Sequence, residues 1–185
     1  YPKDFYYLLN KPAGVISATT DPEKTVLDLF AAEDYRRDLF PVGRLDKDTE
    51  GLLLITNDGQ LAHRLLSPKK HVEKEYYAEV RGIMTEEDRH QFLQGIELDG
   101  ETLMPAQLTI LKVDEQAETS TITLILHEGK FHQVKRMVQA VGKEVTYLKR
   151  TRMGGLQLPK DLALGEYRSV TQKELAQLSA EPAED

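Results

Sequence analysis

The stretch GRLDKDTEGLLLITNDG, from Gly43 to Gly59, places four acidic and two basic side chains around the wholly apolar run LLLI. Such a run is typical of a buried strand, and the glycines and acids on either side of it mark turns. Arg44 and Asp46 flank Leu45, and in an extended chain both charged side chains point away from the side that Leu45 faces. The stretch therefore predicts a buried strand that follows a charged connection.

Several explanations of that charged connection can be weighed. Asp46, Asp48 and Glu50 before Gly51 match the opening of an EF-hand calcium loop, which also needs a helix on each side and a bidentate Glu at its twelfth position. The twelfth residue here is Asn57, and an apolar strand follows. A phosphotransfer Asp-x-Asp-x-Thr motif normally follows a buried strand, whereas this one precedes it. A plain charged turn and a catalytic carboxylate beside an arginine both stay open.

Short strands and short helices are predicted along the rest of the chain, without strict β-α-β alternation. Strands are expected twice within 5–17 and at 41–45, 51–57, 74–82, 106–113, 120–129 and 144–153. Helices are expected at 25–30, 59–68, 85–96, 130–142 and 170–178. This pattern favours an α+β fold with a mixed, mainly antiparallel sheet and helices packed on its faces.

Two of the helices carry a capping-box pattern at their first turn, Thr85 with Asp88 and Thr171 with Glu174. One domain is expected over 3–178, with a weakly signalled division near 82–84 and a disordered tail at 179–185.

Charge is segregated along the chain. The net charge is −7, but 84–120 holds nine acids and two bases, whereas 127–160 holds eight bases and two acids. The basic segment fits a phosphate-binding footprint. A solvated surface balanced by acids elsewhere explains the same numbers, so charge alone leaves both possibilities open.

Composition limits the remaining classes. The chain has 185 residues with no Cys and no Trp, which excludes disulfides, thiolate chemistry and Cys-based zinc sites. No apolar run approaches the roughly 20 residues that span a bilayer, and the start YPKDFYYLL lacks the layout of a signal peptide. A cytoplasmic protein is therefore expected.

Four blocks in order resemble the pseudouridine synthases of the RsuA/RluA superfamily. They are YYLLNKPAGVIS (6–17), GRLDKDTEGLLLITNDG (43–59), KEYYAEVRG (74–82) and EGKFHQVKRMVQAVG (128–142). The last block, with RTRMGGLQL after it, is most similar to the RsuA-type branch that modifies 16S ribosomal RNA. The resemblance covers nearly all of the chain from Phe5 to Leu178. Members of this branch usually carry an S4-type RNA-binding domain before the catalytic domain, and no such block is found in this sequence.

The resemblance implies a role for single residues. The family's catalytic aspartate falls on Asp46, its active-site tyrosine on Tyr76, and the basic partner of the aspartate on Lys135. Arg44 takes a place associated with RNA contact and extrusion of the target base. Without the resemblance, Lys135 would be read as a solvated helix cation and Tyr76 as a core tyrosine.

The implied reaction converts uridine to pseudouridine and needs neither a cofactor nor a metal. The basic residues expected to contact RNA are Arg44, Lys130, Arg136, Lys149, Arg150 and Arg152. The expected partner is 16S ribosomal RNA or a small-subunit assembly intermediate, and a monomer is expected. The alternatives are a synthase acting on 23S ribosomal RNA and a ribosome-assembly factor that binds RNA without turnover.

Overall fold

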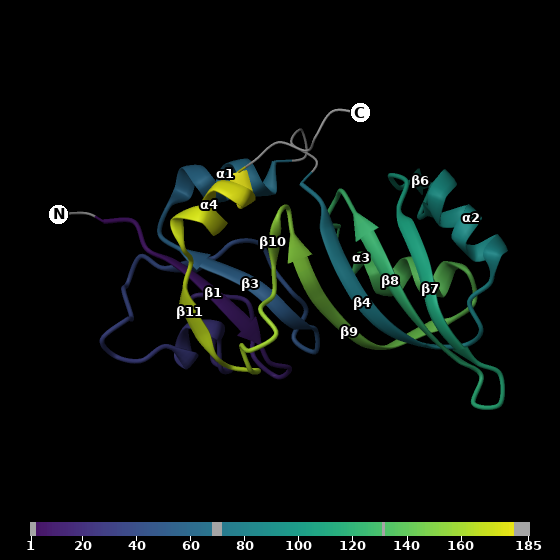
Figure 1. The fold of residues 1–185 in the computed structure, drawn as a ribbon, viewed down its shortest axis with the longest axis horizontal. Helices are drawn as coiled ribbons and strands as arrows, with labels where there is room; N and C mark the ends of the chain where they lie inside the picture. The colour runs from purple at the N-terminus through teal and green to yellow at the C-terminus, as the bar shows by residue number, and fades with distance from the viewer. Residues whose placement is uncertain (1–2, 68–71, 131, 180–185) are drawn as a thin grey trace. The chain divides into compact units, whose positions relative to one another are not determined.

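A computed structural model describes residues 3–67, 72–130 and 132–179 (Figure 1). The chain divides into two compact units, the first comprising 1–72 and 151–185 and the second 73–150. The predicted division near 82–84 instead lies inside the second unit, where the backbone N–H of Gly82 donates to the carbonyl of Glu118 at 2.7 Å. Gly82 has a φ of 117°, so the signal marked a turn at the end of a strand.

The first unit is built on antiparallel strands. Its strands are β1 (Tyr6–Lys11), β2 (Phe40–Pro41), β3 (Glu50–Thr56), β10 (Leu156–Gln157) and β11 (Tyr167–Ser169). β1 pairs with β3 and with β11, and β2 pairs with the end of β3. Its helices are the 3-10 helix η1 (Val26–Leu29), α1 (Gly59–Leu66) and α4 (Gln172–Ser179).

The apolar run of β3 is buried on both faces. Leu54 pairs with Leu8 of β1 on one face and contributes to a core with Leu61 and Leu65 of α1. Leu178 of α4 joins the same core, and α1 and α4 lie side by side over this face in Figure 1. Leu53 and Ile55, which alternate with these residues and face the other side, are also buried, so the run contains no polar residue.

The second unit is also mainly antiparallel. β8 (Thr119–Leu126) lies between β4 (Lys74–Arg81) and β7 (Gln107–Asp114), and a small hairpin joins β5 (Glu97–Leu98) to β6 (Glu101–Thr102). The helices are α2 (Glu86–Gln94) and α3 (Gln133–Ala140). β9 (Glu144–Met153) begins in the second unit and ends in the first.

The core of the second unit joins its sheet to its helices. Ala78 and Val80 of β4 are buried against Phe92 of α2 and against Val134 and Val138 of α3. Tyr76, on the same side of β4, packs against this core while it stays partly exposed. The strand predicted at 74–82 is therefore confirmed, and Tyr76 lies at the edge of its buried side. The helix predicted at 130–142 includes Phe131, which lies outside the described residues.

The predicted α+β class with a mainly antiparallel sheet is confirmed. The expected second strand within 5–17 is reduced to one isolated bridge between Ile16 and Thr25. Ser179 belongs to α4 and not to the predicted tail, whose residues 180–185 lie outside the described part of the chain. Among the described helices, none has the length and apolar character that crossing a membrane requires.

Candidate active site

The charged connection before β3 is an irregular loop of the first unit. The strand predicted at 41–45 ends at Pro41, because Gly43 turns the chain with a φ of 80°. Burial still alternates as expected: Leu45 is buried, Arg44 is exposed and Asp46 is half-buried. Extended geometry thus survives without strand pairing, and it presents Asp46 on the side opposite the core.

The side chain of Lys11, the last residue of β1, contacts the backbone of this loop. Its side chain is 0% exposed, and its ammonium nitrogen lies 3.1 Å from the carbonyl oxygens of Asp46 and Lys47 and 2.7 Å from that of Thr49. The carbonyl of Pro12 lies at 3.1 Å from the same nitrogen. A buried ammonium is tolerated only where such oxygens replace its lost hydration. Lys11 therefore fixes the backbone at Asp46 and in the residues that follow it.

Further contacts from the segment after β1 hold the same loop. The buried Ser17 hydroxyl accepts a hydrogen bond from the backbone N–H of Leu45 and donates to its carbonyl, both at 3.1 Å. The N–H of Gly14 donates to the carbonyl of Lys47 at 2.9 Å. The Asp46 carbonyl also accepts from the N–H of Thr49 at 3.0 Å, which closes a tight turn. The backbone of Asp46 is thus held on several sides.

We expect Lys11→Met to lower the free energy of unfolding by roughly 2–4 kcal/mol, because the buried carbonyls around Asp46 lose their donor. Urea unfolding followed by circular dichroism measures this loss. Lys47→Met is the matched control, since Lys47 lies in the same loop but pairs with Glu23 on the exposed surface. An unfolding midpoint for Lys11→Met equal to that of the control would contradict the stabilising role given to the hydrogen bonds of Lys11.

The calcium interpretation of the loop is not supported by its surroundings. Strands β2 and β3 flank it, where an EF-hand needs helices. Asn57, at the twelfth position, is engaged elsewhere: its Oδ1 accepts the N–H of Phe5 at 2.7 Å, and its Nδ2 donates to Asp38 at 3.1 Å. Within the described residues, no group of three or more acidic or histidine side chains is arranged to hold a metal ion.

β4 places Tyr76 and Lys74 on one side of the second unit's sheet, since they are two residues apart. Burial, together with the nearby charge of Arg150, lowers the pKa of Lys74 to about 8. An amine with this pKa exchanges protons near neutral pH. Sequence reasoning missed Lys74, although its place on the apolar side of β4, in line with Ala78, was a usable signal.

Lys135 lies on α3, between Val134, which is buried, and Arg136. Its side chain is half-buried, as expected for a residue at the margin of the helix's apolar face. Because α3 and Tyr76 contribute to the same core, the second unit carries both residues on one framework. Asp46 belongs to the first unit, so the three residues with implied chemical roles come from both units.

The basic residues with implied RNA contacts differ in exposure. Arg44 is exposed and Lys149 is half-exposed, whereas Arg150 is only 3% exposed. Arg152 donates from Nη1 to the carbonyl of Gly154 at 2.7 Å. Lys130 and Arg136 form ion pairs with acids of the β5–β6 hairpin. These basic residues therefore differ in how accessible they are to an anion such as phosphate.

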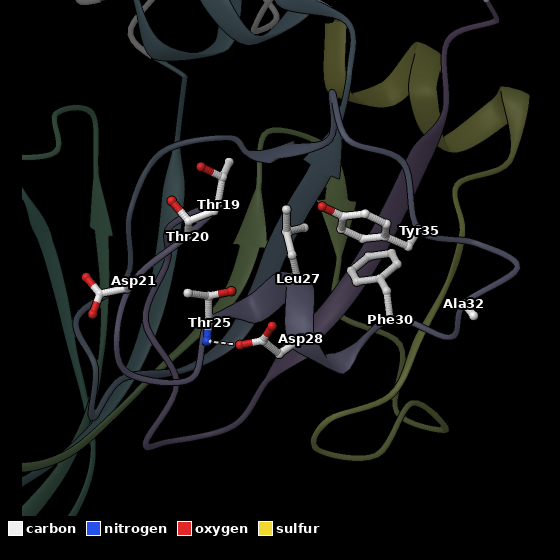
Figure 2. A pocket seen from close by; sticks show the side chains of 9 residues that line it. All are labelled: Thr19, Thr20, Asp21, Thr25, Leu27, Asp28, Phe30, Ala32 and Tyr35. Carbon is white, nitrogen blue, oxygen red and sulfur yellow. Dashed lines mark hydrogen bonds between the residues drawn. The ribbon is translucent and has the colours of Figure 1, made fainter.

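The first unit also contains a cavity of about 540 Å³ beside η1 (Figure 2). Figure 2 shows the hydroxyls of Thr19 and Thr20 on one side and the rings of Phe30 and Tyr35 on the other. The described residues that line it are Thr19, Thr20, Asp21, Thr25, Leu27, Asp28, Phe30, Ala32 and Tyr35. None of these described residues is basic, so they do not form a phosphate site.

Comparison with known proteins gives one consistent family. Residues 5–140 match the sequence profile described as RNA pseudouridylate synthase. A solved structure described as a crystal structure of pseudouridylate synthase superposes with a TM-score of 0.88 at 38% identity, and the match covers 96% of this chain and 75% of the other.

Three curated bacterial relatives match over most of their length. The uncharacterized RNA pseudouridine synthase YtzG of Bacillus subtilis is 49% identical, and the match covers 95% of this chain and 73% of the relative. Ribosomal small subunit pseudouridine synthase A of Escherichia coli K12 is 42% identical, with 92% and 72% covered. Ribosomal large subunit pseudouridine synthase B of Bacillus subtilis is 43% identical, with 95% and 71% covered.

Proposed function

Because this chain belongs to the RNA pseudouridylate synthase family and is a pseudouridine synthase, we propose that it isomerises one uridine of 16S ribosomal RNA. The similarity to ribosomal small subunit pseudouridine synthase A supports this substrate, together with the RsuA-type blocks at 128–142 and 150–158. The relative named for the large subunit is similar to nearly the same degree, at 43% against 42% identity. A uridine of 23S ribosomal RNA is therefore the second candidate.

The reaction breaks the bond between N1 of uracil and C1′ of ribose, turns the base and joins C5 to C1′. The proton on C5 is lost and N1 gains one, so atoms and electrons balance without an oxidant, a reductant or a cofactor. We assign the chemical step to Asp46, whose carboxylate acts near C1′ as nucleophile or base. The observation that supports this assignment is the set of hydrogen bonds from Lys11, Ser17 and Thr49 to the loop around Asp46. These bonds fix the Asp46 backbone before substrate binds.

Tyr76 and Lys135 are proposed to assist from the second unit. The partly exposed ring of Tyr76 offers a face on which an everted uracil can stack. The ammonium of Lys135 is proposed to keep the Asp46 carboxylate ionised in a site that excludes water. Both assignments follow the positions of these residues in the family's blocks at 74–82 and 128–142.

RNA binding is assigned to exposed and half-exposed cations. Everting a uridine from folded RNA costs a few kcal/mol of unstacking, which contacts to phosphates can offset. Arg44, Lys149 and Arg152 are proposed for such contacts, together with Lys130 and Arg136 once their carboxylate partners are exchanged. Arg150 is left out of this set, because a side chain that is 3% exposed offers little surface to a phosphate. We place this activity in ribosome biogenesis, with a monomer acting in the cytoplasm on ribosomal RNA or an assembly intermediate, without a metal.

Mapping pseudouridine in ribosomal RNA tests the substrate. Cells with and without the gene are compared, and the deletion strain is complemented with the wild-type chain or with Asp46→Asn. We expect one 16S position to lose pseudouridine in the deletion strain and to regain it only with the wild-type chain. Loss at a 23S position instead would identify the second candidate. If the deletion strain keeps every pseudouridine but assembles its subunits poorly, the assembly factor without turnover would be favoured.

A further inference from the structure

A tight acidic hairpin of the second unit lies against two of the cations assigned to RNA. Asp99 and Gly100 connect β5 to β6 with φ values of 51° and 79°, the left-handed values that a two-residue type I′ turn requires. Glu101 follows directly and pairs with Leu98 across the hairpin. The turn therefore places the carboxylates of Asp99 and Glu101 together at the hairpin tip.

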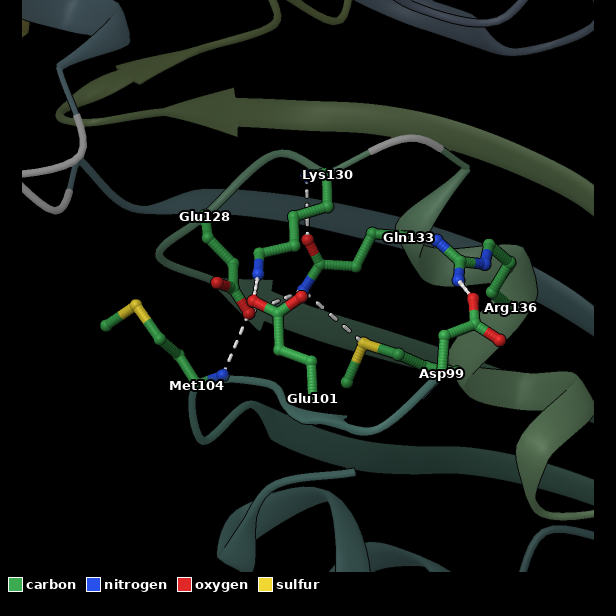
Figure 3. A network of polar contacts seen from close by, with 8 residues as sticks. Asp99, Glu101, Met104, Glu128, Lys130, Gln133 and Arg136 are labelled. Atoms are coloured by element: carbon green, nitrogen blue, oxygen red, sulfur yellow. Dashed lines mark hydrogen bonds and ion pairs between the residues drawn. The ribbon is translucent and has the colours of Figure 1, made fainter. Parts of the chain in front are cut away.

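Each carboxylate of this tip makes an ion pair with a cation of the α3 region. Asp99 pairs with Arg136 and Glu101 pairs with Lys130 (Figure 3). The acid side chains are 84% and 59% exposed, whereas those of Arg136 and Lys130 are 32% and 36% exposed. Solvated pairs of this kind contribute little to stability, so a competing anion can replace either carboxylate.

The backbone that carries Lys130 is held by contacts that do not involve the hairpin tip. The buried Gln133 accepts the backbone N–H of Lys130 at its Oε1, at 2.9 Å, and donates from Nε2 to Glu128 at 3.0 Å. The same Glu128 oxygen accepts the N–H of Met104 at 2.8 Å. The framework that carries Lys130 and the start of α3 thus persists when the carboxylates of the tip move away.

The base of the hairpin is fixed separately from its tip. The N–H of Leu103 donates to the carbonyl of Ile96 at 2.8 Å, and both side chains are buried. A Cβ at Gly95 would lie 2.6 Å from the carbonyl oxygen of Leu103, so the two segments are closely packed. Movement is therefore confined to the solvated residues beyond this base.

We propose that Asp99 and Glu101 form an acidic latch, whose carboxylates occupy the places of RNA phosphates on Arg136 and Lys130 and are displaced when RNA binds. This inference rests on the proposed function, since it takes RNA as the incoming ligand. A folded RNA that presents one phosphate to Arg136 and another to Lys130 replaces both lost ion pairs. A random polyanion that engages only one cation does not, so the latch lowers non-specific affinity.

The latch is tested by neutralising it without changing the backbone. The double variant Asp99→Asn, Glu101→Gln keeps both side-chain shapes, and Asn-Gly is itself a favoured type I′ turn. We expect it to bind a single-stranded uridine oligonucleotide roughly three- to tenfold more tightly than the wild-type chain. The control Glu97→Gln, Glu115→Gln changes net charge equally, and both acids are exposed and unpaired within the described residues.

A double-mutant cycle separates a latch from a general charge effect. Lys130→Gln with Arg136→Gln is introduced into the wild-type chain and into the latch-neutral variant, and oligonucleotide affinity is measured in all four proteins. We expect the loss of affinity to be at least threefold larger in the latch-neutral background, because RNA phosphates then no longer compete with the two carboxylates of the tip.

Two results would overturn the latch. One is equal tightening in the charge control and the latch-neutral variant, and the other is an additive cycle. Neither measurement requires turnover or a particular ribosomal RNA. A chain that modifies 23S ribosomal RNA, or none, would therefore still report on the latch, while the mapping experiment alone decides the proposed function.

Discussion

Asp46→Asn is expected to lower the rate of pseudouridine formation by at least about 10³-fold, because the amide cannot act as the carboxylate nucleophile or base at C1′. The amide is nearly isosteric, and the backbone contacts of Asp46 to Lys11 and Thr49 do not use the side chain. The variant should therefore keep the native fold. Single-turnover assays on a 16S transcript or an assembly intermediate measure the rate, and circular dichroism measures the fold.

The matched control for this variant is Asp48→Asn. Asp48 lies two residues away in the same loop, and its side chain is exposed. It should retain activity within a few-fold of the wild-type chain. Full activity of Asp46→Asn would remove the chemical assignment, and equal losses in both variants would indicate that loop charge and not a single carboxylate matters.

Lys135→Met is the second variant with a large expected effect. We expect the rate constant of the chemical step to fall by roughly 10- to 100-fold, because the variant lacks the ammonium that is proposed to stabilise the charge of the Asp46 carboxylate. RNA affinity should fall by much less, since the assigned partner of Lys135 is a carboxylate. Single-turnover rates at saturating protein measure the chemical step, and a binding titration with the same RNA measures affinity.

Lys149→Met provides the contrast, because Lys149 is half-exposed and assigned to phosphate contact. It should weaken RNA binding while single-turnover rates at saturating protein stay the same. Equal losses of rate and affinity in Lys135→Met would reduce Lys135 to a phosphate contact.

Locally determined features were the ones that the sequence predicted well. The capping box of α2 is confirmed by hydrogen bonds in both directions between Thr85 and Asp88, at 3.0 and 3.2 Å. That of α4 is confirmed between Thr171 and Glu174, at 3.0 and 3.1 Å. Each box depends only on residues three apart, so no distant partner has to be known.

Features that depend on distant partners were missed or misplaced. β11 is three residues long and exists because Tyr167 pairs with Leu9, which no local pattern indicates. The β5–β6 hairpin was also missed, although Asp99 followed by Gly100 is a strong turn signal that could have found it. Strands of two residues leave no periodicity to detect.

In the candidate site, too, some features could be predicted from the sequence and others could not. Asp46, Tyr76 and Lys135 were identified because they occur within blocks that resemble a known family, and their roles remain predictions. The burial of Lys11 was not predicted, since a lysine beside a proline reads as a surface residue until its carbonyl partners are known. Similarly, the sequence shows that Arg150 is basic but not that its side chain is buried.

The first unit is discontinuous in sequence, and this has a consequence for its synthesis on the ribosome. Tyr7 of β1 pairs in register with Ser169 of β11, so the strand that ends in Lys11 gains this neighbour only after residues 167–169 have been synthesised. At the usual elongation rates of about 5–20 residues per second, the wait is on the order of ten to thirty seconds. A nascent chain therefore completes the unit that carries Asp46 last, after the second unit has emerged.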